Sequence, residues 1–214
     1  RNLLNKSADN VWLGKGFQSR LVTINELASE ITSGHAYSFE YENDRRSKKS
    51  FRAADFISVD IDNGLTLDEA KSIPIVAQCA SIIYTTASHT EAAHRFRIVF
   101  ALARTLTDPL HVEATAKSLA SRLGGDQRAT DAARLYYGNS SAQIEVFNRG
   151  IPETTLDELV SQTINVVGED RTGNDTCTRR SELTISKGHR IQAKDGRWGS
   201  IFDFADRTSV HCPF

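Results

Sequence analysis

The chain has 214 residues, of which 39% are hydrophobic and 25% charged, and its formal net charge is −1. A chain of this length and composition can bury one good core and still carry an appendage. The near-zero charge excludes nucleic-acid binding by bulk electrostatics, so any such binding must come from local basic patches.

The sequence lacks the usual signals for membrane insertion and export. It contains no run of 18 apolar residues and no signal-like N-terminus. Its three cysteines, Cys79, Cys177 and Cys212, are widely spaced and odd in number, which fits a reducing interior better than a disulfide framework. We therefore expect a cytoplasmic protein with no membrane partner. Because the chain starts at Arg1 and contains no Met, we interpret it as a piece of a longer protein.

Helices and strands are mixed along the sequence without a strict βαβ order. Capping boxes, an N1 proline and glycine stops predict helices over 23–34, 66–74, 109–123 and 154–160. Alternating or β-rich apolar runs predict strands over 36–41, 56–62, 81–86, 94–102, 134–138 and 143–147. This mixture favours an α+β fold over a doubly wound sheet.

The composition changes near residue 167. The stretch from there to residue 180 is rich in Gly, Asp, Asn, Thr and Arg and offers little to bury. An apolar pattern then resumes at Leu183 and includes Trp198 and Phe202. We therefore expect a main domain over 1–165, a linker over 166–182 and a small C-terminal appendage over 183–214.

Two aspartates close the strand predicted over 56–62. Because side chains alternate along a strand, Asp60 and Asp62 share one face with Ser58. Neighbouring carboxylates repel each other unless a cation lies between them, and such oxygen ligands suit Mg²⁺ or Mn²⁺. The pair predicts a metal site for phosphoryl transfer, and the alternative is a strand running out into a polar turn.

His89 follows the next predicted strand, and two arginines follow His89. If the strands over 56–62 and 81–86 are neighbours, His89 lies at the same sheet edge as the aspartates and can donate to a phosphate oxygen. Alternation places Arg95 and Arg97 on one face, where paired guanidinium groups can bind phosphates. The alternatives are a surface histidine and a solvent-facing basic strand.

Further acidic residues could complete a metal cage. Asp126 follows the helix end at Gly124, and Asp131 lies five residues later. Asp131 also fits an ordinary cap or turn residue. Glu145, in the strand over 143–147, is a further candidate acid, and a cross-strand ion pair is the favoured interpretation for it.

The order of these motifs resembles the archaeo-eukaryotic primase superfamily, in particular the primase-polymerases of phages, plasmids and bacterial mobile elements. The resemblance covers roughly residues 20 to 160. It is carried by Ser58-Val59-Asp60-Ile61-Asp62, Thr85-Thr86-Ala87-Ser88-His89 with Arg95-Phe96-Arg97, and Asp126 to Asp131 with Ala133-Arg134-Leu135-Tyr136-Tyr137-Gly138. It implies an RRM-like palm with flanking helices and makes residues 1–165 a primase-polymerase catalytic domain.

The resemblance implies a catalytic set with defined roles. Asp60, Asp62 and Asp126 would hold Mg²⁺ or Mn²⁺, with Asp131 as the rival third acid, and His89 would contact the triphosphate of the incoming nucleotide. The family often has Ser-x-His in its second motif, whereas Ala87 stands two residues before His89 here, so Thr86 or Ser88 would supply the hydroxyl.

The same resemblance implies substrates and partners. The substrates would be nucleoside or deoxynucleoside triphosphates and a single-stranded DNA template, and a helicase domain could follow in a C-terminal part beyond this chain. The expected nucleotide-binding residues are His89, Ser88, Arg95, Arg97, Arg134 and Tyr137. The expected nucleic-acid-binding residues are Arg45, Arg46, Lys48 and Lys49, for which a solvated charged loop is the alternative. For Tyr136 and Tyr137, base stacking and core packing both remain open.

Other functions make different demands on the sequence. The segment Val210 to Phe214 resembles the opening of a zinc ribbon, but a tetrahedral zinc site needs four ligands and only Cys212 is present, so no zinc is expected. A nicking enzyme would need a His-x-His pair, which the chain lacks. We therefore expect template-directed nucleotidyl transfer, with a non-catalytic single-strand-binding module on the same fold as the alternative.

Overall fold

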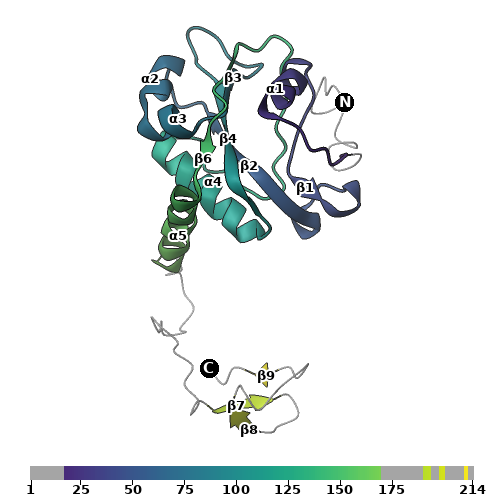
Figure 1. The fold of residues 1–214 in the computed structure, drawn as a ribbon. Coiled ribbons are helices and arrows are strands. Elements are labelled where there is room, and N and C mark those ends of the chain that lie inside the picture. Colours follow the sequence, from purple (N-terminus) through teal and green to yellow (C-terminus); the bar gives the residue numbers. More distant parts are fainter. Residues whose placement is uncertain (1–16, 170–189, 194–197, 201–209, 212–214) are drawn as a thin grey trace. The chain divides into compact units, whose positions relative to one another are not determined.

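The computed structural model describes residues 17–169 and three short segments, 190–193, 198–200 and 210–211 (Figure 1). The chain divides into two compact units, Arg1–Asp170 and Arg171–Phe214. In the described part of the chain, no helix combines the length and the apolar character needed to cross a membrane.

The first unit is a mixed helix and sheet domain, which confirms the predicted α+β class. Its sheet has the strand order β1-β2-β4-β3-β5, and β6 pairs in parallel with β4, whereas the other pairs are antiparallel. The strands are β1 (Glu40–Tyr41), β2 (Phe51–Ile61), β3 (Ile82–Thr85), β4 (Phe96–Leu106), β5 (Ile144–Val146) and β6 (Gly150–Ile151). The helices are α1 (Ile24–Thr32), α2 (Leu67–Ser72), α3 (Pro74–Cys79), α4 (Pro109–Leu123) and α5 (Glu153–Glu169).

Local capping signals set the ends of the helices. Thr23 and Thr66 each form a complete capping box with a glutamate three residues later, at the starts of α1 and α2. Asp108 caps α4, and Gly124 ends this helix with a left-handed φ of 64°. These helix boundaries agree with the sequence prediction.

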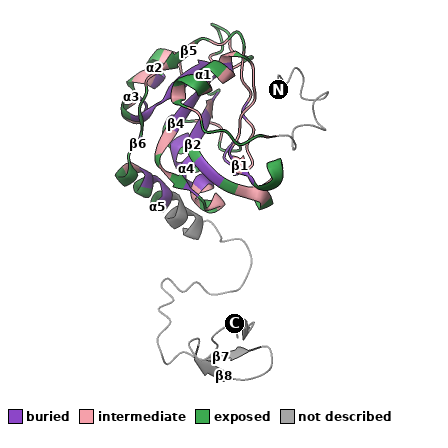
Figure 2. Cartoon of the chain, turned by 45° about the vertical axis from the view of Figure 1, so that its right-hand side comes forward, coloured by how far each residue is buried: buried purple, intermediate pink, exposed green. Residues whose placement is uncertain are grey.

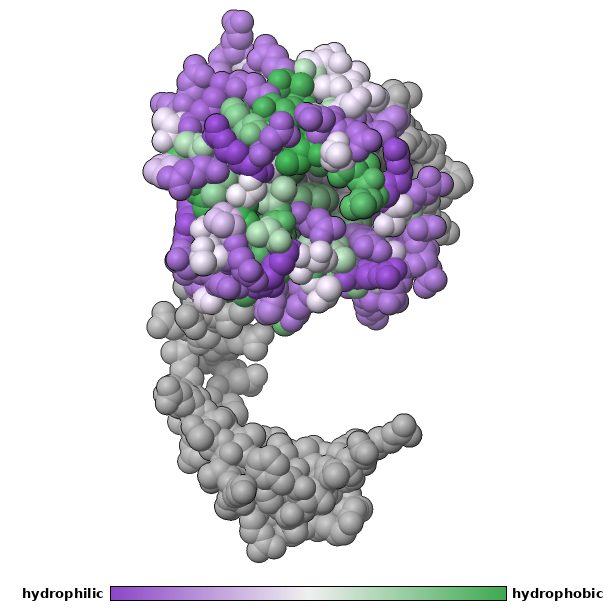
Figure 3. Space-filling model, in the orientation of Figure 1, coloured by the Kyte–Doolittle hydropathy of each residue, from purple (hydrophilic) through white to green (hydrophobic). Residues whose placement is uncertain are grey.

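Helices cover both faces of the sheet (Figure 2). One hydrophobic cluster joins the sheet to buried residues of α2, α3, α4 and α5, among them Val112, Leu119 and Leu156. A smaller cluster packs Ala28 and Ile31 of α1 against β3 and β4 on the other face. The visible surface of this unit is mostly hydrophilic, with a smaller hydrophobic group near its centre (Figure 3). The sheet is therefore a buried layer whose polar side chains need partners inside the fold.

Three elements differ from the sequence prediction. Most of the strand predicted over 36–41 is absent, and only Glu40–Tyr41 joins the sheet. Residues 134–138 form no strand with 143–147, because Tyr136 bridges to Tyr37 whereas β5 pairs with β3. Pro74 begins the unpredicted helix α3 at its first turn.

The C-terminal part of the prediction is described only in pieces. Helix α5 continues to Glu169, beyond both the predicted helix end at residue 160 and the domain end at residue 165. Residues 170–182 of the predicted linker, with Cys177, lie outside the described residues, as does Cys212. Within the predicted appendage, β7 (Arg190–Ala193) pairs antiparallel with β8 (Trp198–Ser200) and β9 (Val210–His211).

Candidate nucleotide and metal site

A pocket of about 610 Å³ lies where β2, β3 and the start of β4 meet the loop after α4. Candidate residues from all three sequence motifs line it, so segments far apart in the chain come together there. Its charged and polar lining residues are Arg46, Asp60, Asp62, Thr86, Ser88, Arg95, Arg97, Asp126, Asp131, Arg134 and Tyr137. The pocket thus combines carboxylates with guanidinium groups.

The sheet register places two of these residues, Asp60 and Arg97, in one row with Tyr84 of β3. Arg97 of β4 lies opposite Asp60 of β2 on one side and opposite Tyr84 of β3 on the other. Directly opposite side chains on one face of a sheet are close enough to interact. The register therefore builds a row of a carboxylate, a guanidinium group and a phenol across the three strands.

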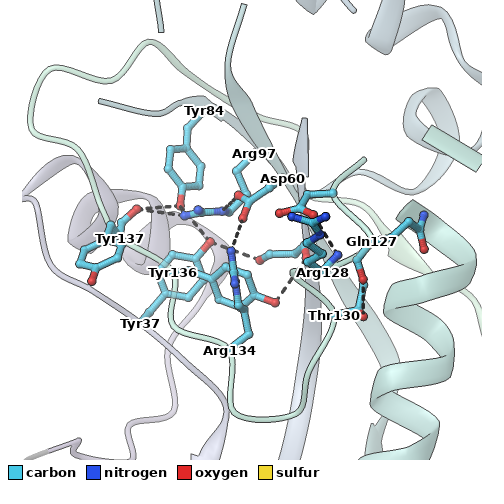
Figure 4. Close-up of polar contacts among 12 residues, drawn as sticks. Tyr37, Asp60, Tyr84, Arg97, Gln127, Arg128, Thr130, Arg134, Tyr136 and Tyr137 are labelled. Atoms are coloured by element: carbon cyan, nitrogen blue, oxygen red, sulfur yellow. Dashed lines mark hydrogen bonds and ion pairs between the residues drawn. The ribbon is translucent and has the colours of Figure 1, made fainter. Parts of the chain in front are cut away.

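Arg97 is held inside the fold by several partners (Figure 4). Its Nε donates to Asp60 Oδ1 over 2.5 Å, and its Nη1 donates to the Tyr84 hydroxyl and, over 3.1 Å, to the Tyr137 carbonyl oxygen. Its guanidinium carbon also lies 5.0 Å from the ring centre of Tyr136. The side chain is only 7% exposed. Burial alone would lower the pKa of Arg97, but the Asp60 carboxylate beside it acts in the opposite direction and the pKa is raised, so the group stays charged.

A second arginine completes the contacts of Asp60. Arg134 Nη2 lies 3.3 Å from Asp60 Oδ2, so each carboxylate oxygen contacts a guanidinium group (Figure 4). The Arg134 side chain is 33% exposed and lines the pocket. Arg46 also lines the pocket and donates to the backbone carbonyl of Ala133. Two arginines therefore reach this wall from different parts of the chain.

Asp126 is brought to β2 by the tight turn that ends α4. A Cβ on Gly125 would lie 2.6 Å from Val59 Cγ1 and 2.9 Å from the Asp60 carbonyl oxygen, so only glycine lets the turn approach so closely. The Asp126 N–H donates to that carbonyl oxygen over 3.0 Å. Asp126 Oδ1 accepts the Arg128 N–H over 2.8 Å. The turn thus fixes Asp126 beside Asp60.

The two remaining acids are more open. Asp62 is exposed and forms no ion pair within the described residues. Asp131 is also exposed, and its Oδ1 accepts the Ala133 N–H over 3.0 Å in a turn, as the alternative interpretation of this residue predicted. Both carboxylates line the same pocket as Asp60 and Asp126.

The acids fit a divalent ion only in part. No three acidic, histidine or cysteine side chains in the described part of the chain are grouped so that they could hold a metal ion. Within the described residues, Asp62 and Asp126 offer hard oxygen donors that form no ion pair with an arginine or lysine side chain, which suits Mg²⁺ or Mn²⁺. Mg²⁺ is commonly held by one or two carboxylates together with substrate phosphates, so two protein ligands are enough. The Asp60 carboxylate, in contrast, is already engaged by two cations.

His89 is the predicted catalytic residue that does not line the pocket. Its Nδ1 accepts the Arg95 N–H over 3.1 Å, and its ring packs edge-on against His94 with a centroid distance of 5.2 Å. This hydrogen bond joins His89 to Arg95, the residue just before β4. Ser88 and Arg95 are exposed, and both line the pocket.

The predicted nucleic-acid-binding loop lies partly away from the pocket. Lys48 forms an ion pair with Glu113 of α4 over 2.7 Å, so its positive charge already has a partner in the protein. Arg45 and Lys49 are exposed and form no ion pair within residues 17–162.

The candidate acid Glu145 forms an ion pair, as the favoured interpretation predicted, but its partner is Lys71 of α2 at 2.5 Å. Glu145 is thus no part of the acidic set.

Sequence reasoning missed the polar layer beneath the pocket. The Tyr37 hydroxyl lies 3.2 Å from both Ser58 Oγ and the Tyr84 hydroxyl, and the Tyr84 hydroxyl donates to the Tyr137 carbonyl oxygen over 3.0 Å. Burial raises the pKa of Tyr84 well above its ordinary value, so the phenol stays neutral. Only one signal could have indicated this layer, namely a serine at position 58 on the same strand face as Asp60.

Comparisons with known proteins include one solved structure and one family model. A solved structure of the cyanophage S-2L primase-polymerase (PrimPol), AEP domain, matches with 12% sequence identity and a TM-score of 0.42. The match covers 54% of this chain and 65% of that chain, which is less than two thirds of its length. No curated protein matches the chain.

A family model gives the broader match. The model described as VapE N-terminal domain matches residues 38–158, which is more than half of the chain. Asp60, Asp62, His89, Asp126 and Arg134 all fall inside the matched range. The chain belongs to the VapE N-terminal domain family.

Proposed function

We propose that this domain transfers nucleotides from nucleoside triphosphates to a growing strand on a single-stranded DNA template. The observation that carries the proposal is the mixed charge of the pocket, where acids and arginines from four separate segments face the same space. A triphosphate needs cationic side chains for its oxygens, and a divalent ion needs carboxylates beside them. A pure binding module would gain nothing from acids next to phosphates.

The arginines have the more direct role. Arg95 and Arg134 are at least partly exposed at the pocket wall and can contact the triphosphate, because guanidinium groups bind phosphate oxygens in pairs. The Ser88 hydroxyl adds a donor at the same wall. Tyr137, which also lines the pocket, offers a ring surface for a base or sugar.

Asp62 and Asp126 would hold a divalent ion together with the phosphate oxygens of the substrate. Such an ion stabilises the charge that develops as the leaving group departs. Asp126 is fixed for this role by its turn beside β2, and Asp62 by its position directly after the strand end. Exposed Arg45 and Lys49 would contact template phosphates, and their contacts would weaken as salt rises. A helicase domain acting with this one is a further part of the proposal and rests on the sequence resemblance.

The test is nucleotide incorporation on primed and unprimed single-stranded templates with Mg²⁺ or Mn²⁺. We expect metal-dependent extension by wild type and loss of at least about a hundredfold in Asp62→Ala/Asp126→Ala, because the ion would lose both protein ligands. Asp68→Ala is the matched control, since this acid is 94% exposed and pairs with Lys71 outside the pocket. Products on the unprimed template would identify a primase.

A negative result is equally informative. If wild type incorporates no nucleotide while single-strand binding is the same in wild type and the double variant, the catalytic proposal is wrong. The chain would then be a single-strand-binding module.

A further inference from the structure

The charge balance at the base of the pocket depends on Asp60. Its side chain is 17% exposed and lies between Arg97, which is 7% exposed, and Arg134. A buried guanidinium that loses its counter-charge is strongly destabilising, because the remaining charge is neither hydrated nor paired. In the part of the chain that the structure describes, Asp60 is the carboxylate paired with Arg97.

The same contacts make Asp60 a poor metal ligand. A divalent ion on this carboxylate would lie next to two guanidinium groups, and like charges at such distances repel. Among the described residues, no guanidinium group forms an ion pair with Asp62 or Asp126. Asp60 therefore has a different electrostatic environment from Asp62 and Asp126.

Asp60 also acts on the pocket wall through Arg97. The guanidinium group that it anchors donates to the carbonyl oxygen of Tyr137 and to the Tyr84 hydroxyl, which itself donates to the same carbonyl oxygen. Tyr137 lines the pocket, and so does Arg134 on the other oxygen of Asp60. Loss of the Asp60 charge would therefore loosen two parts of the wall that face the nucleotide.

We propose that Asp60 is a positioning residue, which fixes Arg97 and Arg134 so that the pocket can bind a nucleoside triphosphate, while Asp62 and Asp126 hold the divalent ion. This inference rests on the proposed function and divides the acids of its site into two roles. It assigns Asp60 a role other than the metal ligand that the sequence resemblance implied.

The first experiment separates metal affinity from nucleotide affinity. Binding of Mn²⁺ alone is followed through the electron paramagnetic resonance of the free ion, and binding of a nonhydrolysable nucleoside triphosphate at saturating Mn²⁺ is followed by calorimetry. For Asp60→Asn we expect Mn²⁺ affinity within about twofold of wild type and triphosphate affinity reduced about tenfold, as for residues that orient a site indirectly. For Asp62→Asn we expect Mn²⁺ affinity to fall about tenfold or more.

Arg97→Lys is the matched variant for the positioning role. Lysine keeps the positive charge but cannot span Asp60, the Tyr84 hydroxyl and the Tyr137 carbonyl oxygen in the way the planar guanidinium does. It should therefore weaken triphosphate binding and leave Mn²⁺ binding unchanged. In folded Asp60→Asn, a loss of Mn²⁺ affinity comparable to that in Asp62→Asn overturns the proposal.

The second experiment needs neither metal nor nucleotide. In metal-free protein, Asp60→Asn should lower the Tm clearly, whereas Asp62→Asn should not, because only Asp60 neutralises a buried cation. Asp60→Asn/Arg97→Met should recover the Tm, since the Tyr84 hydroxyl still donates to the Tyr137 carbonyl oxygen. Equal Tm values for the two single variants, or no recovery in the double variant, overturn the proposal.

The two experiments keep the proposals distinguishable. If wild type binds neither Mn²⁺ nor the triphosphate, the proposed function is wrong, and the metal-free Tm values alone decide the role of Asp60. If Asp60→Asn does not fold, Asp60→Asn/Arg97→Met replaces it in the Mn²⁺ titration. Retained Mn²⁺ affinity in that double variant supports the positioning role, and lost affinity overturns it.

Discussion

At the scale of single residues, Arg95 and Arg97 show why a strand pattern can mislead. Alternation predicted that both arginines share one face, but Arg95 precedes β4 and is exposed, whereas Arg97 is the second residue of β4 and is buried. A charged residue at alternating spacing usually indicates a solvated face. Here the partners that allow burial, Asp60 and Tyr84, lie on other strands, and the sequence around Arg97 gives no sign of them.

The Tyr84 hydroxyl gives a prediction at this scale. Tyr84→Phe should reduce the free energy of unfolding by about 2 kcal/mol, because buried Arg97 and the Tyr137 carbonyl oxygen each lose a partner. Urea unfolding followed by circular dichroism measures the change. Tyr136→Phe is the control, since its hydroxyl makes one longer bond, of 3.3 Å, to the Ser58 carbonyl oxygen. Equal losses in the two variants would contradict the role given to Tyr84.

At the scale of elements, the sequence predicted the ends of helices well and the pairing of distant segments poorly. The capping boxes at Thr23 and Thr66 and the glycine end of α4 involve residues a few positions apart, so the sequence displays them directly. The segment 134–138 alternates as a strand would, yet it bridges through Tyr136 to Tyr37, nearly a hundred residues away. Such a partner is set by the packing of the whole domain. The sequence displays the acids of the candidate site because they lie in short local motifs. It does not display the polar layer beneath them, because the packing of the whole domain brings its members together.

The capping boxes predict a dependence of stability on pH. Backbone hydrogen bonds from Thr23 and Thr66 hold the pKa values of Glu26 and Glu69 below their ordinary value of 4.5. A carboxylate whose pKa is lower in the folded state stabilises the protein above its unfolded pKa, and this contribution is lost as the pH falls through the folded value. Wild type should therefore lose more stability than Glu26→Gln/Glu69→Gln between pH 5 and pH 3 (a range about the ordinary glutamate pKa).

Thermal unfolding across this range measures the difference. Glu42→Gln/Glu91→Gln is the control, since these exposed glutamates cap no helix. If the capping variant and the control lose stability in parallel with wild type, the capping glutamates do not contribute.

At the scale of the whole molecule, all the described pocket residues belong to the first unit. Helix α5 completes that unit, because Leu156, Leu159 and Val160 are buried in the main core against the sheet and α4. The boundary of the pocket-forming unit therefore follows α5 and does not fall within it.

Two truncations test this boundary. A chain that ends at Asp170 should keep the stability and triphosphate affinity of the whole chain. A chain that ends at Pro152 should lose about 5 kcal/mol in free energy of unfolding, because three buried apolar side chains are removed. Urea unfolding and calorimetric titration measure the two quantities. Loss of triphosphate binding in the chain that ends at Asp170 would show that residues beyond 170 contribute to the site.

The position of Arg97 on β4 limits how this protein can diversify. The strand pairs with β2, β3 and β6, so the residue that organises the pocket also belongs to the most connected strand of the sheet. Selection for a different substrate cannot alter Arg97 without also reducing folding yield. New specificities should arise first at exposed positions such as Ser88 and Arg95, where the chemistry can vary and the scaffold is unaffected.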